Sequence, residues 1–249
     1  MTRATLALSL LCLASVATAA DPRMLAAAYE IAGRVTGSTA VTFPTNGLVS
    51  YWSMRSSGAT VYDEWSTNNA TATGSPTFGT NYGVKADGVL LVGTSSQYIQ
   101  CGNPAVFQLT NGTVSVWVKT AAAGSGYRGL IVKQNSYNLF LNNNVLTLFD
   151  YSTSTARDTG VNLADNAWHH VAMSFVGGVA GETRIYVDGV QRMATSWARV
   201  NDNSQISLGS NLGAQYISAS VDEAAIYSAI LSSNLIANIY NGGAGRFYP

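Results

Sequence analysis

The chain has 249 residues, with 13 basic and 13 acidic side chains and a formal net charge of zero. Only 10% of its residues are charged, against about 25% in an average protein. Because no basic run is present that could follow a phosphate backbone, we expect no nucleic-acid partner. Small, hydroxyl and amide residues replace the charges, and such a neutral surface suits an extracellular setting and neutral polar ligands such as sugars.

The first 20 residues have the three parts of a secretory signal peptide. Arg3 supplies the positive region, ALSLLCLASV the apolar region, and ATAA the small residues of a cleavage site after Ala19 or Ala20. The apolar run is too short to span a bilayer. We therefore expect residues 1–20 to be removed and the mature protein to be secreted, extracellular or at the cell surface, without membrane insertion. A retained amphipathic N-terminus is the alternative.

Cleavage after Ala20 would leave Cys101 as the only cysteine, so we expect no intrachain disulfide. Cys101 follows the apolar stretch YIQ, which predicts a small buried side chain rather than a reactive thiol. The stability of the mature protein must then come from its hydrophobic core, with or without a bound ion.

Residues 21–45 are expected to form an N-terminal segment and linker, before a single domain at 46–243 and a tail at 244–249. Within the domain, apolar residues alternate with polar ones, as in TVSVWVK and HVAMSFV, which predicts half-buried strands. TRIYVDGVQRM predicts a hairpin that turns at Asp188-Gly189. YNLFLNNNVLTLFD predicts a second hairpin that turns at 142–144.

The last periodic stretch, LSSNLIANIYNGG, predicts a short helix with a serine N-cap at 232 or 233. Its apolar stripe would consist of Leu235, Ile236, Ile239 and Tyr240, and Asn241 with the following glycines would end it. Short, regularly spaced strands and one helix predict an all-β fold: a two-sheet antiparallel jelly-roll sandwich with one short C-terminal helix.

Four phrases then occur in a suggestive order: GLVSYWSM, AWHHVAMSF, RIYVDGV and VDEAAIYSAILSSNLIANIY. Together they resemble the laminin G-like, concanavalin A-like lectin/glucanase jelly-roll domains, a group that is also pentraxin-like. The resemblance covers about residues 46–243. It implies two antiparallel sheets packed face to face and a role in binding or adhesion, with glycans as the commonest ligands. Some members of the group are glycosidases.

The only histidines are the adjacent pair His169 and His170. Neighbouring side chains of a strand point to opposite faces, so both cannot ligate one metal ion from regular strand geometry. A cysteine pair is also lacking, so we predict a structural role for both and no transition-metal site.

We predict no catalytic residues. The glycosidases of the resembling group carry acids at alternate strand positions, in a Glu-x-Asp-x-x-Glu pattern, whereas no glutamate here has an acid two residues away. The pairs Asp63-Glu64 and Asp222-Glu223 are adjacent, so in strands they would diverge. A pair of acids from separate strands, as in a glycoside hydrolase with an atypical site, is an alternative.

The resemblance also suggests a Ca²⁺ ion bound by oxygen ligands. Asp63, Asn68 and Asn69 in the loop VYDEWSTNNATATG, together with Asp222, are the predicted ligands. The loop departs from the family pattern, because Glu64-Trp65 replaces small residues and its glycine is missing. The alternative is that Asp63 caps a turn and Asp222 accepts hydrogen bonds from a neighbouring backbone.

Sugar sites combine an aromatic platform with amides and hydroxyls. The aromatic residues expected in loops are Trp65, Tyr127, Tyr137, Tyr151, Trp197 and Tyr216. We select Trp65, in the candidate ion loop, and Trp197, which has Asn201 and Asp202 close by in the sequence, as the predicted ligand-binding residues.

The sequence thus predicts a secreted, non-enzymatic binding or adhesion module whose partner is a glycan or a surface protein, most plausibly a carbohydrate. A structural or assembly subunit of a cell-surface, filament or virion-surface structure is an alternative. That alternative would make the protein a homo-oligomer, and the uncharged surface is compatible with tight packing of subunits.

Overall fold

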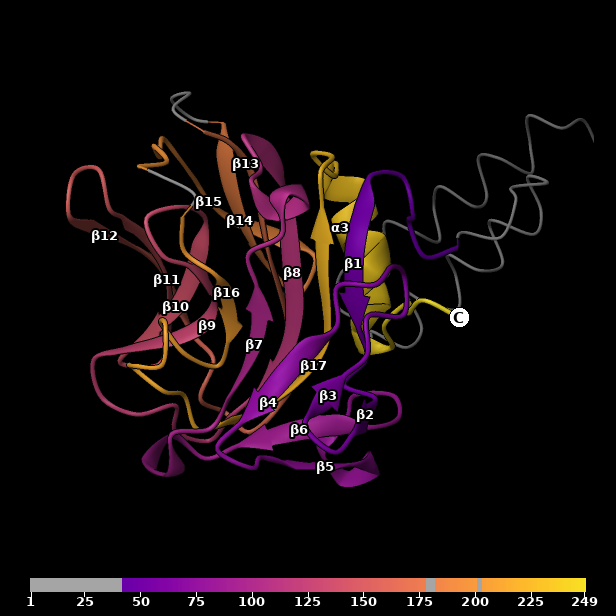
Figure 1. Ribbon diagram of the computed structural model, residues 1–249. Coiled ribbons are helices and arrows are strands. Elements are labelled where there is room, and N and C mark those ends of the chain that lie inside the picture. The colour runs from indigo at the N-terminus through magenta and orange to yellow at the C-terminus, as the bar shows by residue number, and fades with distance from the viewer. Residues whose placement is uncertain (1–41, 178–181, 201–202) are drawn as a thin grey trace, which may run out of the picture.

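The computed structural model describes residues 42–177, 182–200 and 203–249 and is an antiparallel β-sandwich (Figure 1). One sheet has eight strands: β15 (Val190–Thr195), β14 (Thr183–Val187), β13 (Trp168–Val176), β8 (Asn111–Lys119), β17 (Ala219–Tyr227), β6 (Gly88–Leu91) and β5 (Thr77–Gly79), with β1 (Leu48–Trp52) also paired to β17. The other sheet has nine: β12 (Thr155–Asn162), β11 (Val145–Asp150), β10 (Asn138–Asn142), β9 (Tyr127–Lys133), β16 (Ile206–Leu208), β7 (Tyr98–Gly102), β4 (Ala70–Thr73), β3 (Thr60–Val61) and β2 (Ser56–Ser57). The predicted fold class is confirmed.

Helical elements are short. The α-helix of the described residues is α3 (Ser233–Tyr240), and the 3₁₀ turns are η2 (Thr80–Tyr82), η3 (Gly93–Ser95), η4 (Ala105–Phe107) and η5 (Asn241–Gly243). In the part of the chain that the structure describes, no helix has the length and apolar character needed to cross a membrane.

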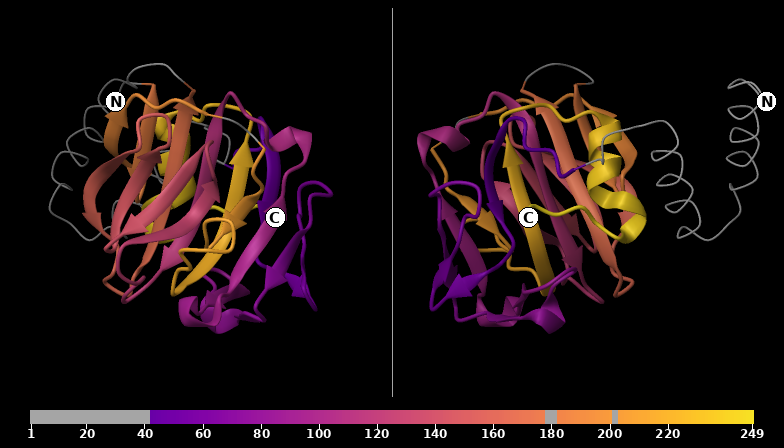
Figure 2. Two further views of the ribbon diagram at one scale, coloured as in Figure 1. Left: turned by 60° about the vertical axis from the view of Figure 1, so that its left-hand side comes forward. Right: turned by 90° about the vertical axis from the view of Figure 1, so that its right-hand side faces the viewer.

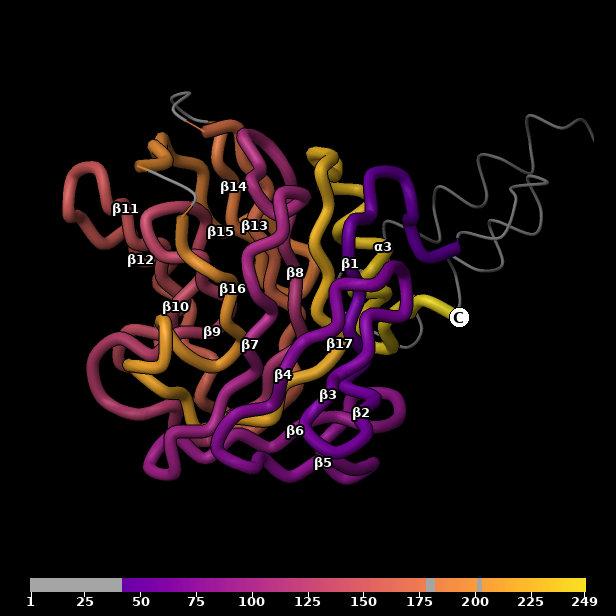
Figure 3. Tube along the Cα trace, viewed as in Figure 1, coloured from indigo at the N-terminus to yellow at the C-terminus, as the bar shows by residue number. Residues whose placement is uncertain are grey.

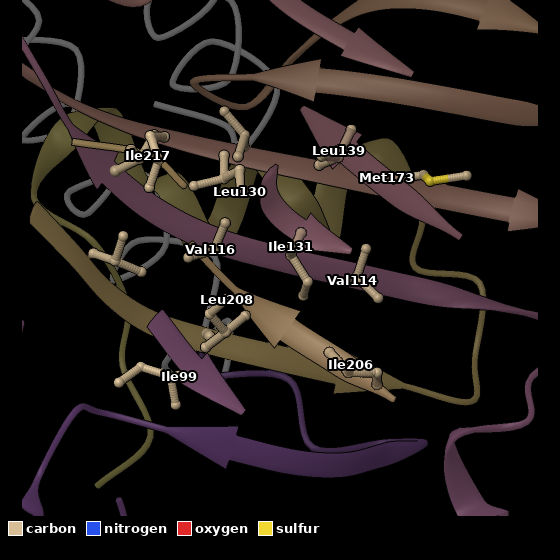
Figure 4. Close-up of a cluster of buried hydrophobic side chains, with 14 of the residues drawn as sticks. Ile99, Val114, Val116, Leu130, Ile131, Leu139, Met173, Ile206, Leu208 and Ile217 are labelled. Carbon is tan, nitrogen blue, oxygen red and sulfur yellow. The ribbon is translucent and has the colours of Figure 1, made fainter. Parts of the chain in front are cut away.

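The main hydrophobic core lies between the two sheets. Val114 and Val116 of β8 point inward together with Met173 of β13, and Ile206 and Leu208 of β16 approach them from the opposite sheet (Figure 4). All five side chains are fully buried. Burial of each side chain stabilises the folded state by about 1.5–3 kcal/mol. Because side chains alternate between the two faces of a strand, the alternating pattern places these apolar residues together in the core. Cys101 belongs to this core, as predicted, and its burial raises the pKa of the thiol.

Both predicted hairpins are present. Asp188 and Gly189 have φ angles of 53° and 73° and join β14 to β15. Asn143 and Asn144, with φ angles of 48° and 71°, join β10 to β11. Two successive left-handed residues match the twist of an antiparallel pair, and asparagine, aspartate and glycine are the residues that tolerate this conformation.

The predicted helix α3 covers the outer face of the eight-stranded sheet (Figure 2). Ser232 is its N-cap and accepts a hydrogen bond from the backbone N–H of Leu235 (3.3 Å), and Asn241 ends it in a left-handed conformation. Ile236 and Ile239 are buried, whereas the Leu235 side chain is 37% exposed. Leu235 therefore does not belong to the buried stripe, because it lies at the margin of the face that meets the sheet.

Candidate functional site

At the centre of the nine-stranded sheet, the outward side consists of residues from β7, β16 and β9. Since Ile99, Ile206 and Leu208 point into the core, the intervening residues point outward. Gln100 of β7 lies opposite Ser207 of β16, and Ser207 lies opposite Val132 of β9. The hydroxyl of Ser207 is buried and has no hydrogen-bond partner among the described residues.

Residues 209–216, the crossing loop, run over this side of the sheet (Figure 3). The backbone N–H of Gly129 donates to the Gln215 carbonyl (2.9 Å), and that of Gly209 donates to the Leu130 carbonyl (2.9 Å). A Cβ atom on Gly129 would lie 2.3 Å from the carbonyl carbon of Ser210. The loop can therefore approach β9 closely because residue 129 has no side chain.

Aromatic side chains stand on both flanks of the crossing loop. The rings of Tyr98 and Tyr216 lie 5.9 Å apart between centroids. On the other flank, Tyr127 packs edge-on against Phe149 (5.7 Å), which in turn packs edge-on against Tyr151 (4.9 Å). All five are partly exposed. Partly exposed rings of this kind present flat apolar surfaces that suit the C–H faces of sugars.

Amides lie between these rings. Asn211 donates from Nδ2 to Oε1 of Gln215 (2.8 Å), and Gln100 donates to Gln205. Burial raises the pKa of Tyr151 to about 12, so the hydroxyl stays protonated at neutral pH. Aromatic platforms with neutral donors and acceptors make a surface that can bind an uncharged, hydroxylated ligand. We call it the open face, formed by Tyr98, Gln100, Tyr127, Phe149, Tyr151, Asn211, Gln215 and Tyr216.

Most of the open face was not selected from the sequence. Tyr127, Tyr151 and Tyr216 were among the aromatic residues expected in loops, although Tyr127 begins a strand. Tyr137, from the same group, is fully buried and stacks on Phe175 (5.1 Å). The surface assembles residues from β7, β9, β11 and the crossing loop, and no local sequence signal brings these together.

The predicted ion loop is a closed, hydrogen-bonded turn around Asp63. Oδ1 of Asp63 accepts the backbone N–H groups of Tyr51 (3.0 Å), Trp65 (3.0 Å) and Ser66 (3.1 Å). Oδ2 accepts the Ser66 hydroxyl (2.8 Å) and the Asn68 N–H (3.3 Å). Asp63 is 6% exposed. Five donors occupy the acceptor positions of both oxygens, so this arrangement is the capped turn that was the alternative interpretation.

The other predicted metal ligands do not complete a calcium cage in this arrangement. Asn69 Oδ1 accepts the backbone N–H of Asp63 (2.9 Å). Asp222 belongs to a separate network, in which Oδ2 accepts the Val84 N–H (2.9 Å) and Oδ1 the Glu223 N–H (2.8 Å). The described residues hold no group of three or more His, Cys, Asp or Glu side chains suited to a metal ion. Calcium binding stays a prediction, and it would require these donors to move.

The predicted ligand-binding residues have different outcomes. Trp65 is 39% exposed and can serve as a platform. Trp197 is 1% exposed and packs edge-on against Phe175 (5.4 Å), so the prediction of an exposed platform there is wrong. Its large apolar ring belongs to the main core, although the segment around it is irregular. Asn201 and Asp202 lie outside the described residues.

The two histidines occupy opposite sides of β13, as predicted. His169 Nδ1 lies 2.8 Å from Asp188 Oδ2, and Nε2 lies 3.0 Å from Asp165 Oδ1. The hydrogen bond to Asp188 is the main cause that raises the pKa of His169. His170 is fully buried against Trp117, with ring centroids 5.4 Å apart, and burial lowers its pKa to about 4. Neither arrangement resembles a metal site or a nucleophile–base pair.

The sequence matches a family model described as "Concanavalin A-like lectin/glucanases superfamily" over residues 93–237. No curated protein sequence matches the chain.

Three similar solved structures share the fold. The binding domain of Paraclostridial Mosquitocidal Protein 1 has a TM-score of 0.61 and 14% identity, covering 79% of this chain and 52% of that chain. The Trypanosoma rangeli sialidase in complex with sialic acid has a TM-score of 0.65 and 18% identity, and the match covers 84% of this chain and 35% of that chain. The third structure is domain 4 of AbnA, an extracellular GH43 arabinanase from Geobacillus stearothermophilus, in complex with arabinotriose. It has a TM-score of 0.60 and 19% identity, and the match covers 76% of this chain and 96% of that chain. The chain thus spans about half of the first protein and about a third of the second.

Proposed function

We propose that this chain, which belongs to the concanavalin A-like lectin/glucanase superfamily, is a secreted, non-enzymatic module that binds neutral carbohydrate. The observation that carries the proposal is the open face, where partly exposed rings and side-chain amides lie on one side of the nine-stranded sheet. Stacking on Tyr98, Tyr127 or Tyr216 would hold the apolar face of a sugar ring, while Gln100 and Asn211 would bond its hydroxyls. The solved complex of a similar domain with arabinotriose agrees in ligand class.

The positions of the acids support a binding role rather than hydrolysis. Glycoside hydrolysis needs two carboxyl groups aimed at one bond. Asp63 is saturated by N–H and O–H donors, and Asp222 accepts two backbone N–H groups within β17 and its neighbouring loop. Neither Asp63 nor Asp222 is part of the open face, and the carboxylate that acts on Tyr127 there is that of Asp158. We therefore propose that the module holds its ligand, in adhesion or attachment, without cleaving it.

A glycan array probed with the full chain tests the proposal. We expect binding to neutral oligosaccharides, with little dependence on salt because no ion pair contributes. Tyr98→Ala and Tyr216→Ala should each weaken binding by about tenfold or more, as loss of an interface ring typically does. Gln191→Ala, an exposed residue of the edge strand β15, is the control and should bind as the unmodified chain does.

Two results would contradict the proposal. One is an array without carbohydrate binding, and the other is binding that survives both tyrosine substitutions. Release of reducing sugar from a bound glycan would instead favour the glycosidase alternative. Secretion is tested separately, because the N-terminal sequence of the exported protein should begin at Ala20 or Asp21.

A further inference from the structure

The chain's last residues, the tail 244–249, fold back onto the domain and place an aromatic ring among three others. The centroid of the Tyr248 ring lies 5.6 Å from that of Tyr51, 5.6 Å from that of Trp65 and 6.3 Å from that of Phe43. The backbone N–H of Tyr248 also donates to the Tyr51 hydroxyl (3.2 Å). We call Phe43, Tyr51 and Trp65 the aromatic slot, which Tyr248 occupies.

The slot is rigidly built. Tyr51 lies in β1 and points to the outer side of the sheet, since its neighbour Trp52 belongs to the inner core. The carboxylate of Asp63 accepts the backbone N–H groups of both Tyr51 and Trp65, so one buried group fixes the two aromatic residues relative to each other. Asp63 therefore acts as a positioning residue for the slot.

The environment of the slot is neutral and amphipathic. Glu64, the nearest acid in sequence to Trp65, pairs with Arg55 (2.9 Å). Tyr51 is buried beneath the tail with its hydroxyl bonded to the Tyr248 N–H, and Trp65 presents a partly exposed face. Flat apolar surface with a hydroxyl at its edge suits a pyranose ring, whose C–H face stacks on aromatic rings while its hydroxyls bond to polar groups. A tyrosine ring has a comparable flat apolar face and polar edge.

The path of the tail depends on one glycine. Gly245 has a φ of 67°, and a Cβ atom there would lie 2.0 Å from Cζ of Phe247. Phe247 in turn packs on Trp117 (6.1 Å) and lies 5.2 Å from the Lys85 ammonium group. Arg246, Phe247 and Tyr248 all remain partly exposed. Hydrogen bonds hold the start of the tail, where the backbone N–H groups of Gly245 and Arg246 donate to the carbonyls of Tyr240 (3.0 Å) and Ile239 (2.8 Å). Tyr248 is held by a hydrogen bond and by ring contacts that are incompletely buried, and a ligand can compete with such contacts.

We propose that the aromatic slot is a second carbohydrate subsite, with Trp65 as its platform, and that Tyr248 covers it as an intramolecular substitute for the sugar. The inference rests on the proposed function only for the ligand class. Binding at this subsite requires the tail to leave, so the apparent affinity is reduced by the fraction of molecules in which the slot is open. The covered slot would make the module monovalent until the tail is displaced.

Two single substitutions should open the slot. Gly245→Ala strains the tail, because alanine disfavours a φ of 67° and its Cβ crowds the Phe247 ring, and Tyr248→Ala removes the occupant while leaving the slot intact. We expect each to increase affinity for neutral oligosaccharides in solution by about tenfold, measured by titration calorimetry, because opening removes the competition. Tyr248→Phe is the matched control, since it keeps the ring in the slot and should change affinity little.

Double variants separate this subsite from the open face. Trp65→Ala should abolish the gain caused by Gly245→Ala, whereas Tyr98→Ala should lower binding at the open face and leave the gain intact. A gain that persists without Trp65 would overturn the proposal. Hydrogen exchange of residues 244–249 reports release of the tail directly. Release of the tail without any gain in affinity would contradict the proposed subsite. Protection of residues 244–249 in both variants would show that the tail cannot be displaced, which would also contradict the proposal.

Discussion

His170 offers a sharp test of how the eight-stranded sheet and the C-terminal helix are joined. Its ring is fully buried, and neither ring nitrogen has a partner among the described residues. Trp117 lies against the ring, and Tyr240 of α3 stacks on Trp117 at 5.9 Å. Protonation would place an uncompensated charge in this layer, which is why burial lowers the pKa to about 4 from its ordinary 6.5.

The magnitude follows from linkage. A group with a depressed pKa contributes its full stability above its unfolded value of 6.5 and loses it as the pH falls through about 4. A difference of 2.5 between the two pKa values corresponds to about 3 kcal/mol of unfolding free energy. His170→Phe should therefore gain about 3 kcal/mol relative to the unmodified chain between pH 7 and pH 4. At pH 7 the unfolding free energies of the variant and the unmodified chain should differ by less than this. Removing the unpaired ring nitrogens is favourable, and this gain offsets the cost of packing the larger phenyl ring.

Urea unfolding followed by tryptophan fluorescence across this pH range measures the effect. The comparison must use the difference between the two proteins. Burial raises the pKa of Asp222 to about 7 and that of Glu223 to about 8, so their contributions are present at low pH and lost as the pH rises through those values. These terms cancel in the difference.

His169→Asn is the matched control from the adjacent position. The pKa of His169 is raised, so its contribution is present below pH 6.5 and lost as the pH rises through the folded value. Its difference curve should slope in the opposite direction. A flat difference curve for His170→Phe would refute the reasoning, because it would mean that the buried ring is already charged or bonded.

Three further predictions concern the core, the crossing loop and the turn. Trp197→Ala should lower the unfolding free energy by about 3–5 kcal/mol, as expected for an emptied core position, and unchanged stability would mean that the indole is not buried. Gly129→Ala should lower the unfolding free energy by about 1–3 kcal/mol, because the added Cβ pushes the crossing loop away from β9. It should also weaken glycan binding, and unchanged binding would mean that the crossing loop does not contribute to the open face. Asp63→Ala should cost about 3 kcal/mol or more in chemical denaturation, because it orphans buried N–H groups. If the predicted ion site forms, calcium should raise the melting temperature and Asp63→Ala should abolish that shift, whereas an unchanged melting temperature would contradict the predicted site.

Several features of the fold could be predicted because they depend on neighbours in the sequence. The alternation around Val114 and Val116 defines which side of β8 is apolar, whatever the strand packs against. Asp188 and Gly189 tolerate left-handed backbone conformations by themselves, so the hairpin is a local property. The serine cap and the left-handed Asn241 bound α3 in the same way. The opposite orientations of adjacent histidines needed only the pleat of a strand.

The candidate site was predictable only in part. The acids of the loop around Asp63 are consistent with either an ion site or a capped turn, and the choice depends on where the N–H groups of Tyr51, Trp65 and Ser66 point. Tyr51 lies in β1, 12 residues before Asp63 in the sequence, so this convergence of N–H groups depends on the fold and not on the residue types of the loop. Trp65 remains a proposed platform, whereas Trp197 proved to be a core residue.

The sequence by itself determined that this chain makes strands of alternating polarity, a capped terminal helix and a neutral surface, since propensity, pleat and charge act over a few residues. Tertiary structure alone decided which aromatic rings meet water. Tyr98 and Tyr216 become neighbours because the crossing loop returns over Gly129, and Tyr248 reaches the slot because Gly245 lets the tail turn back. Such contacts join residues that are far apart along the chain, so they stabilise the protein only after both sheets have formed.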